Sequence, residues 1–208
     1  MTSKHIFSRF AVWALASSSF ACLLGAFYHL WPMRAFACWV FPPCIAMLVW
    51  LAWRGGNERL WIVEGALGGL VAAVLYDLFR VPFVLMGYPL FGVFPLFGQM
   101  LLNAGPHDFG WKVQIAGWIY HFSNGMALGI MFLAMAYRPN RKNLFWGAVA
   151  WTLCVEIMLL LTPYYSYFKL KMDHGAFLWL TLSAHAVFGI VLGLWCRARV
   201  VNAKTAMG

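Results

Sequence analysis

The sequence predicts an all-α protein, a bundle of helices that crosses a membrane several times. Hydrophobic residues make up 63% of the 208-residue chain and charged residues 10%, whereas an ordinary soluble domain has about 25% charged residues. Several apolar runs reach the roughly 20 residues that a helix needs to cross a hydrocarbon core of about 30 Å. The alternating segments of about ten residues that form a membrane β-barrel do not appear. We therefore expect one integral-membrane domain over residues 1–208.

Six apolar runs are long enough to be membrane spans. The first is longer than the apolar core of a typical signal peptide and has no small-residue cleavage site, so we expect it to stay as an uncleaved helix. The connections are short except for the one after the third span. The six spans cover residues of about 10–30, 35–53, 60–80, 111–137, 144–162 and 176–196.

The basic residues predict how the chain is oriented. The net charge is +9, but these residues are scattered through short loops, so we expect no nucleic-acid partner. Lys and Arg are enriched in cytoplasmic loops, and ten fall on one side against four on the other. This bias predicts a multi-pass protein of the inner (plasma) membrane with both termini cytoplasmic. The inner set is Lys4, Arg9, Arg54, Arg59, Arg138, Arg141, Lys142, Arg197, Arg199 and Lys204, and the outer set is Arg34, Lys112, Lys169 and Lys171.

The first two spans have the sequence of packing helices. Three serines at positions 17–19 can bond to their own helix backbone or reach a neighbouring helix. Pro42 and Pro43 lie in the second span. Each proline lacks a backbone donor and crowds the preceding turn, so we expect a kink or a break there.

The third span carries a stripe of small and polar residues. Small side chains let a second helix approach closely, which is how helices associate in lipid. Asp77 and Arg80 are three residues apart on the same face, so we expect them to pair. The stripe consists of Gly65, Gly68, Gly69, Ala72, Ala73, Tyr76, Asp77 and Arg80, at helical spacing.

The stretch that follows, residues 81–103, is apolar but rich in glycine and proline. Irregular backbone at membrane depth is tolerated only where protein buries it or where it lines a cavity. We therefore expect a hairpin or a re-entrant segment that forms a cap or lid. His107 and Asp108 follow it, and we interpret them as an ordinary exposed turn.

A pattern of one histidine and two glycines occurs twice. Residues 121–129 and residues 185–193 both match His-x-x-x-Gly-x-x-Leu-Gly. Aligning Gly68 with Gly147 also places Asp77 opposite Glu156, since each acid lies nine residues after its glycine. The sequence therefore predicts a two-helix duplication, in which spans three and four correspond to spans five and six. A pseudo-two-fold axis would then run along the membrane normal.

Four ionisable residues on four spans are predicted to lie at similar depth. At 1.5 Å per residue, His121 and His185 lie ~12–15 Å from the outer ends of their spans and Glu156 ~9 Å, with Asp77 a few ångströms shallower. An ionised group at this depth costs several kcal/mol unless it is paired. We therefore predict a site of Asp77, His121, Glu156 and His185, open to the outer side, with Arg80 and Asn124 in support.

The chemistry of this set leaves several functions open. Two histidines and two carboxylates suit a divalent metal such as Zn, Fe or Mn, which could activate water in an enzyme acting on a lipid or other apolar substrate. The same residues suit a proton relay or a cation site in a transporter. Two histidines at one level could also bind haem.

Other interpretations need no chemistry at all. The small-residue stripes and the 18% aromatic content also suit a non-catalytic subunit that holds membrane lipid, a second copy of the chain, or another protein of a membrane complex. A buried ion-pair network that only fixes helix register is a further alternative. No Walker loop, dinucleotide-binding fingerprint, nucleophile elbow or His-Glu-x-x-His sequence is present. The sequence therefore names no reaction.

Overall fold

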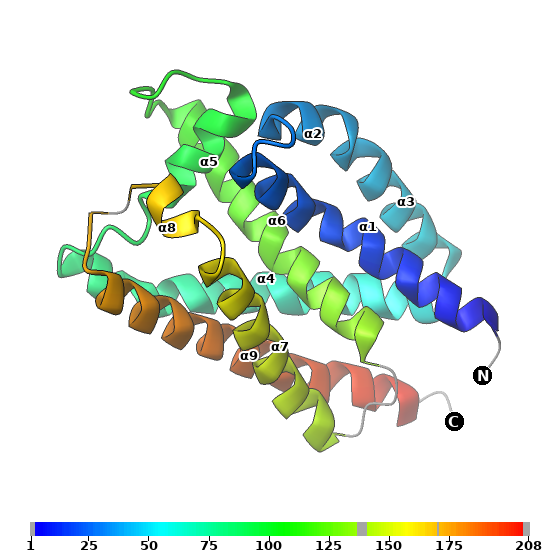
Figure 1. Ribbon diagram of the computed structural model, residues 1–208. Helices are drawn as coiled ribbons and strands as arrows, with labels where there is room; N and C mark the ends of the chain where they lie inside the picture. Colours follow the sequence, from blue (N-terminus) through cyan, green and yellow to red (C-terminus); the bar gives the residue numbers. More distant parts are fainter. Residues whose placement is uncertain (1–2, 137–140, 170, 206–208) are drawn as a thin grey trace.

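A computed structural model describes residues 3–136, 141–169 and 171–205. All the regular elements of these residues are α-helices, which confirms the predicted fold class (Figure 1). They are α1 (Ser3–Phe27), α2 (Met33–Trp39), α3 (Phe41–Arg54), α4 (Gly56–Leu85), α5 (Val93–Leu102), α6 (Trp111–Met135), α7 (Arg141–Leu160), α8 (Tyr164–Tyr167) and α9 (His174–Thr205).

Five segments are long and apolar enough to cross a membrane, as a multi-pass membrane protein requires. They are Ile6–Phe27, Met33–Arg54, Gly56–Leu85, Asn143–Leu160 and His174–Arg199. Large apolar side chains also cover the outside of the bundle; Trp53, Leu85 and Leu161 are each more than 80% exposed. A soluble monomer rarely exposes so much apolar surface, whereas a lipid-facing surface is expected to.

The remaining predicted span, residues 111–137, corresponds to α6. This helix has 25 residues, or about 37 Å at 1.5 Å per residue, so its length suffices to cross. It is not among the five apolar segments because it carries polar residues such as Gln114, His121 and Asn124. It packs against α1, α4 and α5, and that position inside the bundle shelters its polar residues.

Two irregular features predicted from proline and glycine are present. The second span is broken at Val40, directly before Pro42 and Pro43, which occupy the first turn of α3. The stretch 81–103 is a helical hairpin: α4 continues through Pro82 to Leu85, a turn follows, and α5 runs back. The α4 helix is therefore longer than predicted, and the second arm of the hairpin is a regular helix that packs against α6.

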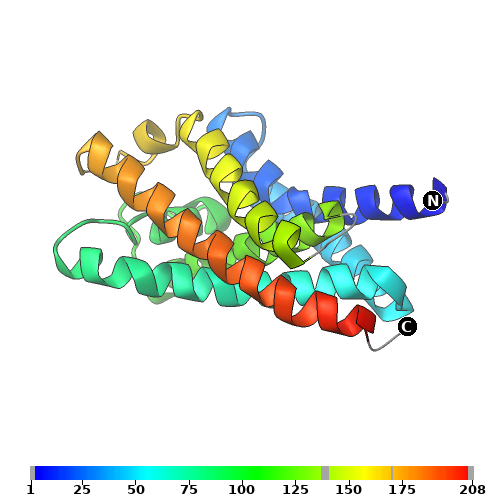
Figure 2. The same cartoon turned by 90° about the horizontal axis from the view of Figure 1, so that it is seen from below.

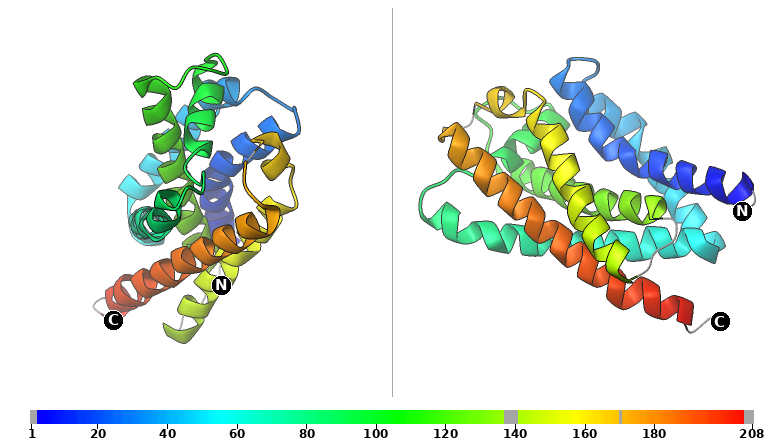
Figure 3. Two further views of the ribbon diagram at one scale, coloured as in Figure 1. Left: turned by 90° about the vertical axis from the view of Figure 1, so that its left-hand side faces the viewer. Right: turned by 60° about the horizontal axis from the view of Figure 1, so that its bottom comes forward.

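The α4 helix lies at the centre of the bundle, with α6 on one side and α9 on another. Figures 2 and 3 show α9 running alongside α4, with α7 packed against α9. The first helix begins and the last ends at the same end of the molecule (Figure 2). All eight residues of the predicted stripe on α4 are buried, so the stripe is the surface on which the other helices pack.

The glycines of the repeated pattern lie where two helices approach closely. Gly125 and Gly129 of α6 face the backbone of Gly69 and Gly65 on α4. The corresponding glycines of α9 also lie close to a neighbouring helix. Gly189 faces Thr152 and Val149 of α7, and Gly193 faces Phe145 of α7. Each copy of the pattern therefore packs on the preceding helix of its predicted pair, while the duplication itself stays a prediction.

The close approach of α4 and α6 leads to a test by substitution. A Cβ added at Gly69 would overlap the carbonyl oxygen of Gly125, so Gly69→Ala forces the helices apart. We expect it to lower the free energy of unfolding by about 1–3 kcal/mol, measured by reversible unfolding in mixed detergent micelles. Gly105→Ala is the control, since a Cβ there meets nothing within 4 Å. An equal effect of both substitutions would contradict the packing argument.

Candidate functional site

The first half of the candidate site is a chain of three side chains on α4 and α6. Asp77 and Arg80 form the predicted ion pair, with Oδ1 of Asp77 3.3 Å from Nη1 of Arg80. The other carboxylate oxygen of Asp77, Oδ2, lies 2.8 Å from Nε2 of His121. An ionised carboxylate only accepts hydrogen bonds, so Nε2 carries a proton here and Nδ1 is the nitrogen with a free lone pair. Asp77 thus orients His121 and neutralises Arg80.

The Arg80 side chain is enclosed by the hairpin that follows it. The residue is 4% exposed, and its Nη2 donates a hydrogen bond to the backbone carbonyl of Leu90. Its guanidinium also lies over three aromatic rings, at 4.8 Å from Tyr76, 5.2 Å from Phe91 and 5.6 Å from Phe94. Pairing, a carbonyl and aromatic faces together compensate the buried charge.

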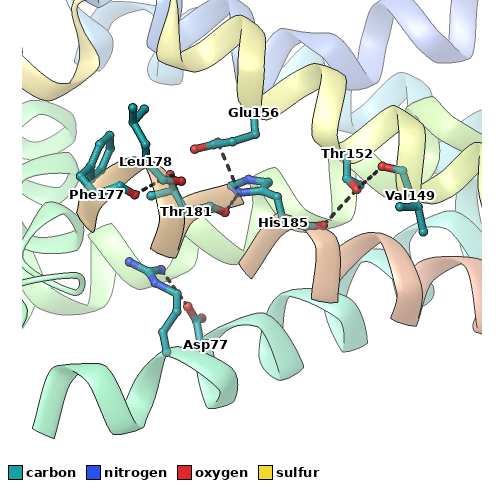
Figure 4. Close-up of polar contacts among 9 residues, drawn as sticks. Asp77, Val149, Thr152, Glu156, Phe177, Leu178, Thr181 and His185 are labelled. Carbon is teal, nitrogen blue, oxygen red and sulfur yellow. Dashed lines mark hydrogen bonds and ion pairs between the residues drawn. The ribbon is translucent and has the colours of Figure 1, made fainter. Parts of the chain in front are cut away.

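The second half is an acid and a histidine on α7 and α9 (Figure 4). Oε2 of Glu156 lies 3.3 Å from Nδ1 of His185. The same nitrogen lies 2.9 Å from the backbone carbonyl of Thr181; since a carbonyl only accepts, Nδ1 carries a proton and donates it there. The Thr152 hydroxyl, 3.0 Å from the carbonyl of His185, ties the two helices together.

Glu156 differs from Asp77 in what surrounds it. The residue is 1% exposed, and its Oε2 is buried without a hydrogen-bond partner among the described residues. The nearest donor, Nδ1 of His185, is directed toward Thr181 instead. A buried carboxylate oxygen without a hydrogen bond is costly, so this atom requires an explanation that packing does not supply.

Both halves of the site meet in one cavity. Its free volume is about 100 Å³, whereas a single water needs about 10–15 Å³ by the same measure. Arg80, His121, Glu156 and His185 all contribute to its wall. Most of the rest of the wall is apolar or aromatic, and includes Phe94, Leu159, Tyr164, Phe177 and Phe188.

The predicted site residues are therefore brought together as two pairs that share a cavity. Asn124 also lines it and accepts a hydrogen bond from Ser19 of α1, so its role includes holding α1 to α6. In the described part of the chain, no three His, Cys, Asp or Glu side chains are grouped so that they could hold a metal ion. The metal site stays a prediction, and we assign no metal ligand from this geometry.

Two aromatic residues of the site were not among the predicted site residues. The Tyr76 ring contacts both histidines, with centroids 6.0 Å from His121 and 5.0 Å from His185. The Phe94 ring packs on His121 at 4.3 Å. The sequence held a signal for Tyr76, since it precedes Asp77 on the α4 stripe. Phe94 belongs to the stretch that was expected to be irregular. Without a regular helix, the sequence pattern cannot predict which side chains point toward the site.

The net charge of the cavity is set by Glu156 and the two histidines. Arg80 and Asp77 cancel, and burial raises the pKa of the Tyr164 hydroxyl far above its ordinary range, so it stays neutral. Among the described residues that line the cavity, Glu156 is the one carboxylate. With both histidines neutral, one negative charge is left over. One positive charge at Glu156, a proton or another monovalent cation, makes the cavity neutral.

Comparisons of the chain with protein-family models, with curated proteins and with solved structures give no match. The function is therefore argued from the residues of this site.

Proposed function

We propose that this chain is a membrane transporter that binds one proton or one monovalent cation at the Glu156–His185 pair. The observation that carries the proposal is the carboxylate of Glu156, which is 1% exposed, lines a cavity and has an oxygen without a hydrogen-bond partner among the described residues. Ionisable residues at membrane depth mark ion and proton pathways when they face a bundle interior. In the proposed inner-membrane location, with both termini cytoplasmic, a proton or cation gradient across the membrane could drive transport through this site.

The groups that face Glu156 favour a titratable site over a purely structural one. From α9 it faces Nδ1 of His185 at 3.3 Å, and because that nitrogen donates its proton to Thr181, the basic nitrogen of the neutral ring is Nε2. From α4, Arg80 and Tyr76 line the same cavity, and α8 contributes the neutral Tyr164. The charge of Arg80 is already matched by Asp77, and His121 of α6, which also lines the cavity, is bonded to the same carboxylate. Glu156 and His185 are therefore the proposed proton-binding pair.

Proton binding by purified protein tests this proposal. We expect acid–base titration in detergent to show one proton fewer bound per chain in Glu156→Gln than in the wild type. Difference infrared spectra should show a protonated-carboxyl band that the same substitution removes. The matched control is Glu64→Gln, which also removes one carboxyl but leaves the infrared band of Glu156 unchanged, since Glu64 lies on α4, accepts a hydrogen bond from Trp195 and is not part of the cavity wall. Equal titration of Glu156→Gln and the wild type would overturn the proposal.

The metal and haem alternatives are tested on the same preparation. Elemental analysis and a visible spectrum are compared with those of a His121→Ala/His185→Ala double variant. Stoichiometric Zn, Fe or Mn that is lost in the double variant would replace the proton-site proposal with a metal centre. A Soret band lost in that variant would replace it with a haem site.

A further inference from the structure

We infer that the cavity binds a small, apolar organic cation, whose positive charge takes the place of the proton at Glu156. The inference rests on the function proposed above and adds the chemical class of the substrate. In exchange terms, the protein with a proton on the Glu156–His185 pair takes up the organic cation and releases that proton to water. The O–H or N–H bond that held the proton breaks and the proton goes to water, so the charge of the cavity is the same before and after the exchange.

The charge of the ligand follows from the charges of the wall. An anion would need a cationic partner whose charge is not already matched. The charge of Arg80 is matched by Asp77, and its Nη atoms bond to Asp77 and to the Leu90 carbonyl, which leaves its Nε as the nitrogen without a hydrogen bond among the described residues. A divalent cation would leave the cavity with a surplus positive charge. One monovalent cation neutralises Glu156 and supplies the partner that its Oε2 lacks.

The atoms around Glu156 favour an organic cation over a bare metal ion. Hard cations are held by several oxygens, about six to eight for Ca²⁺. Near Glu156, the Thr181 carbonyl is occupied by His185, and the Thr152 hydroxyl lies against backbone carbonyls. The described wall offers no second carboxylate. A bare ion would therefore remain under-coordinated.

The rest of the wall suits the body of such a molecule. Aromatic side chains line the same cavity as the acid, and the face of an aromatic ring attracts a cation. A free volume of about 100 Å³ is several times what one water needs but less than the roughly 150 Å³ of a cavity that binds benzene, so the organic molecule must be compact. The aromatic members of the wall are Phe20, Tyr76, Phe94, Phe97, Tyr164, Phe177 and Phe188.

Tetramethylammonium is a suitable probe because it is compact and its positive charge does not depend on pH. Its uncharged control is neopentane, in which carbon replaces the nitrogen and the shape is kept. Binding to detergent-purified protein is measured by calorimetry, and proton release is measured with a pH-sensitive dye in weak buffer. We expect the cation to bind and to release up to one proton per chain, and the neutral isostere to release none.

Substitutions locate the binding. Because the cation interacts with a charged carboxylate, Glu156→Gln should weaken binding by about 10–100-fold and abolish proton release. Phe177→Leu, which keeps an apolar side chain but removes a ring from the wall, should weaken binding by about 2–10-fold. Glu64→Gln should leave cation binding and proton release unchanged. A cooperative unfolding transition in detergent micelles verifies that each variant is folded.

The possible outcomes separate this inference from the function on which it rests. If the wild type titrates one proton at Glu156 but neither binds the cation nor releases a proton to it, the organic-cation inference is wrong and the proton site stands. Equal binding of the cation and its neutral isostere would also overturn the inference, since charge would then play no part. If Glu156→Gln binds as many protons per chain as the wild type, both the proton-site proposal and the organic-cation inference are wrong.

Discussion

Asp77→Leu is expected to lower the free energy of unfolding by about 3–5 kcal/mol, because it leaves a buried positive charge uncompensated. Arg80 is 4% exposed and pairs with Asp77 at 3.3 Å. Arginine stays protonated in proteins, so it cannot escape the cost by losing its proton. The Leu90 carbonyl and three aromatic rings remain around it, but none of these carries a negative charge. Reversible unfolding in mixed detergent micelles measures the loss.

A double variant shows whether the lost stability comes from the unpaired charge. Replacing both partners, as Asp77→Leu/Arg80→Met, removes the two charges together and should restore most of the stability, as is common for buried ion pairs. If the double variant is as unstable as Asp77→Leu alone, the loss comes from shape and not from charge. A cost below about 1 kcal/mol for the single substitution would mean that Arg80 is compensated elsewhere.

The sequence was sufficient to predict the parts of this fold that depend on local chemistry. Apolar run length located the spans, and the prolines at 42 and 43 located the break between α2 and α3. Helical spacing identified the buried stripe of α4 in full. It also placed Asp77 and Arg80 on one face, where they pair. These features depend on residues close together in the chain, so they can be predicted from the local sequence pattern.

The remaining features depend on contacts between distant segments. The sequence named four ionisable residues but did not say which acid meets which histidine; the structure pairs Asp77 with His121 and Glu156 with His185. Nor did it show that backbone carbonyls, those of Leu90 and Thr181, bind Arg80 and His185. Every residue has a carbonyl, so composition gives no signal for it. The four-residue metal site was predicted from residue type. Whether four residues can bind one metal depends on distances between side chains on different helices, and helical periodicity does not give those distances.

The two carboxylates therefore have different physical situations although the sequence treats them as equivalents. Asp77 has both oxygens engaged, one by Arg80 and one by His121. Glu156 has an oxygen with no hydrogen bond, and its nearest cationic partner is a histidine that is neutral until it gains a proton. A network that only fixes helix register would be expected to satisfy both acids alike. The difference suggests that Asp77 stabilises the fold and that Glu156 is kept for binding.

Glu156→Gln is accordingly expected to change stability in the direction opposite to Asp77→Leu. In buffer basic enough to have removed the proton from the Glu156–His185 pair, the substitution removes an uncompensated buried charge. We expect it to raise the free energy of unfolding by about 1–3 kcal/mol while it abolishes proton binding. A gain in stability with a loss of binding is the signature of a residue retained for function.

The stability measurement uses the same mixed micelles as for Asp77→Leu, with Glu64→Gln as the reference substitution. Glu64 is half-buried and its carboxylate accepts a hydrogen bond from Trp195 at 3.1 Å. Its removal should therefore cost about 1 kcal/mol, not add stability. If Glu156→Gln also costs stability, Glu156 is a structural partner of His185, and the purely structural interpretation of the cluster is preferred. If Glu156→Gln raises the free energy of unfolding and Glu64→Gln lowers it, Glu156 does not stabilise the fold, and ligand binding in the cavity explains why a glutamate occupies this position.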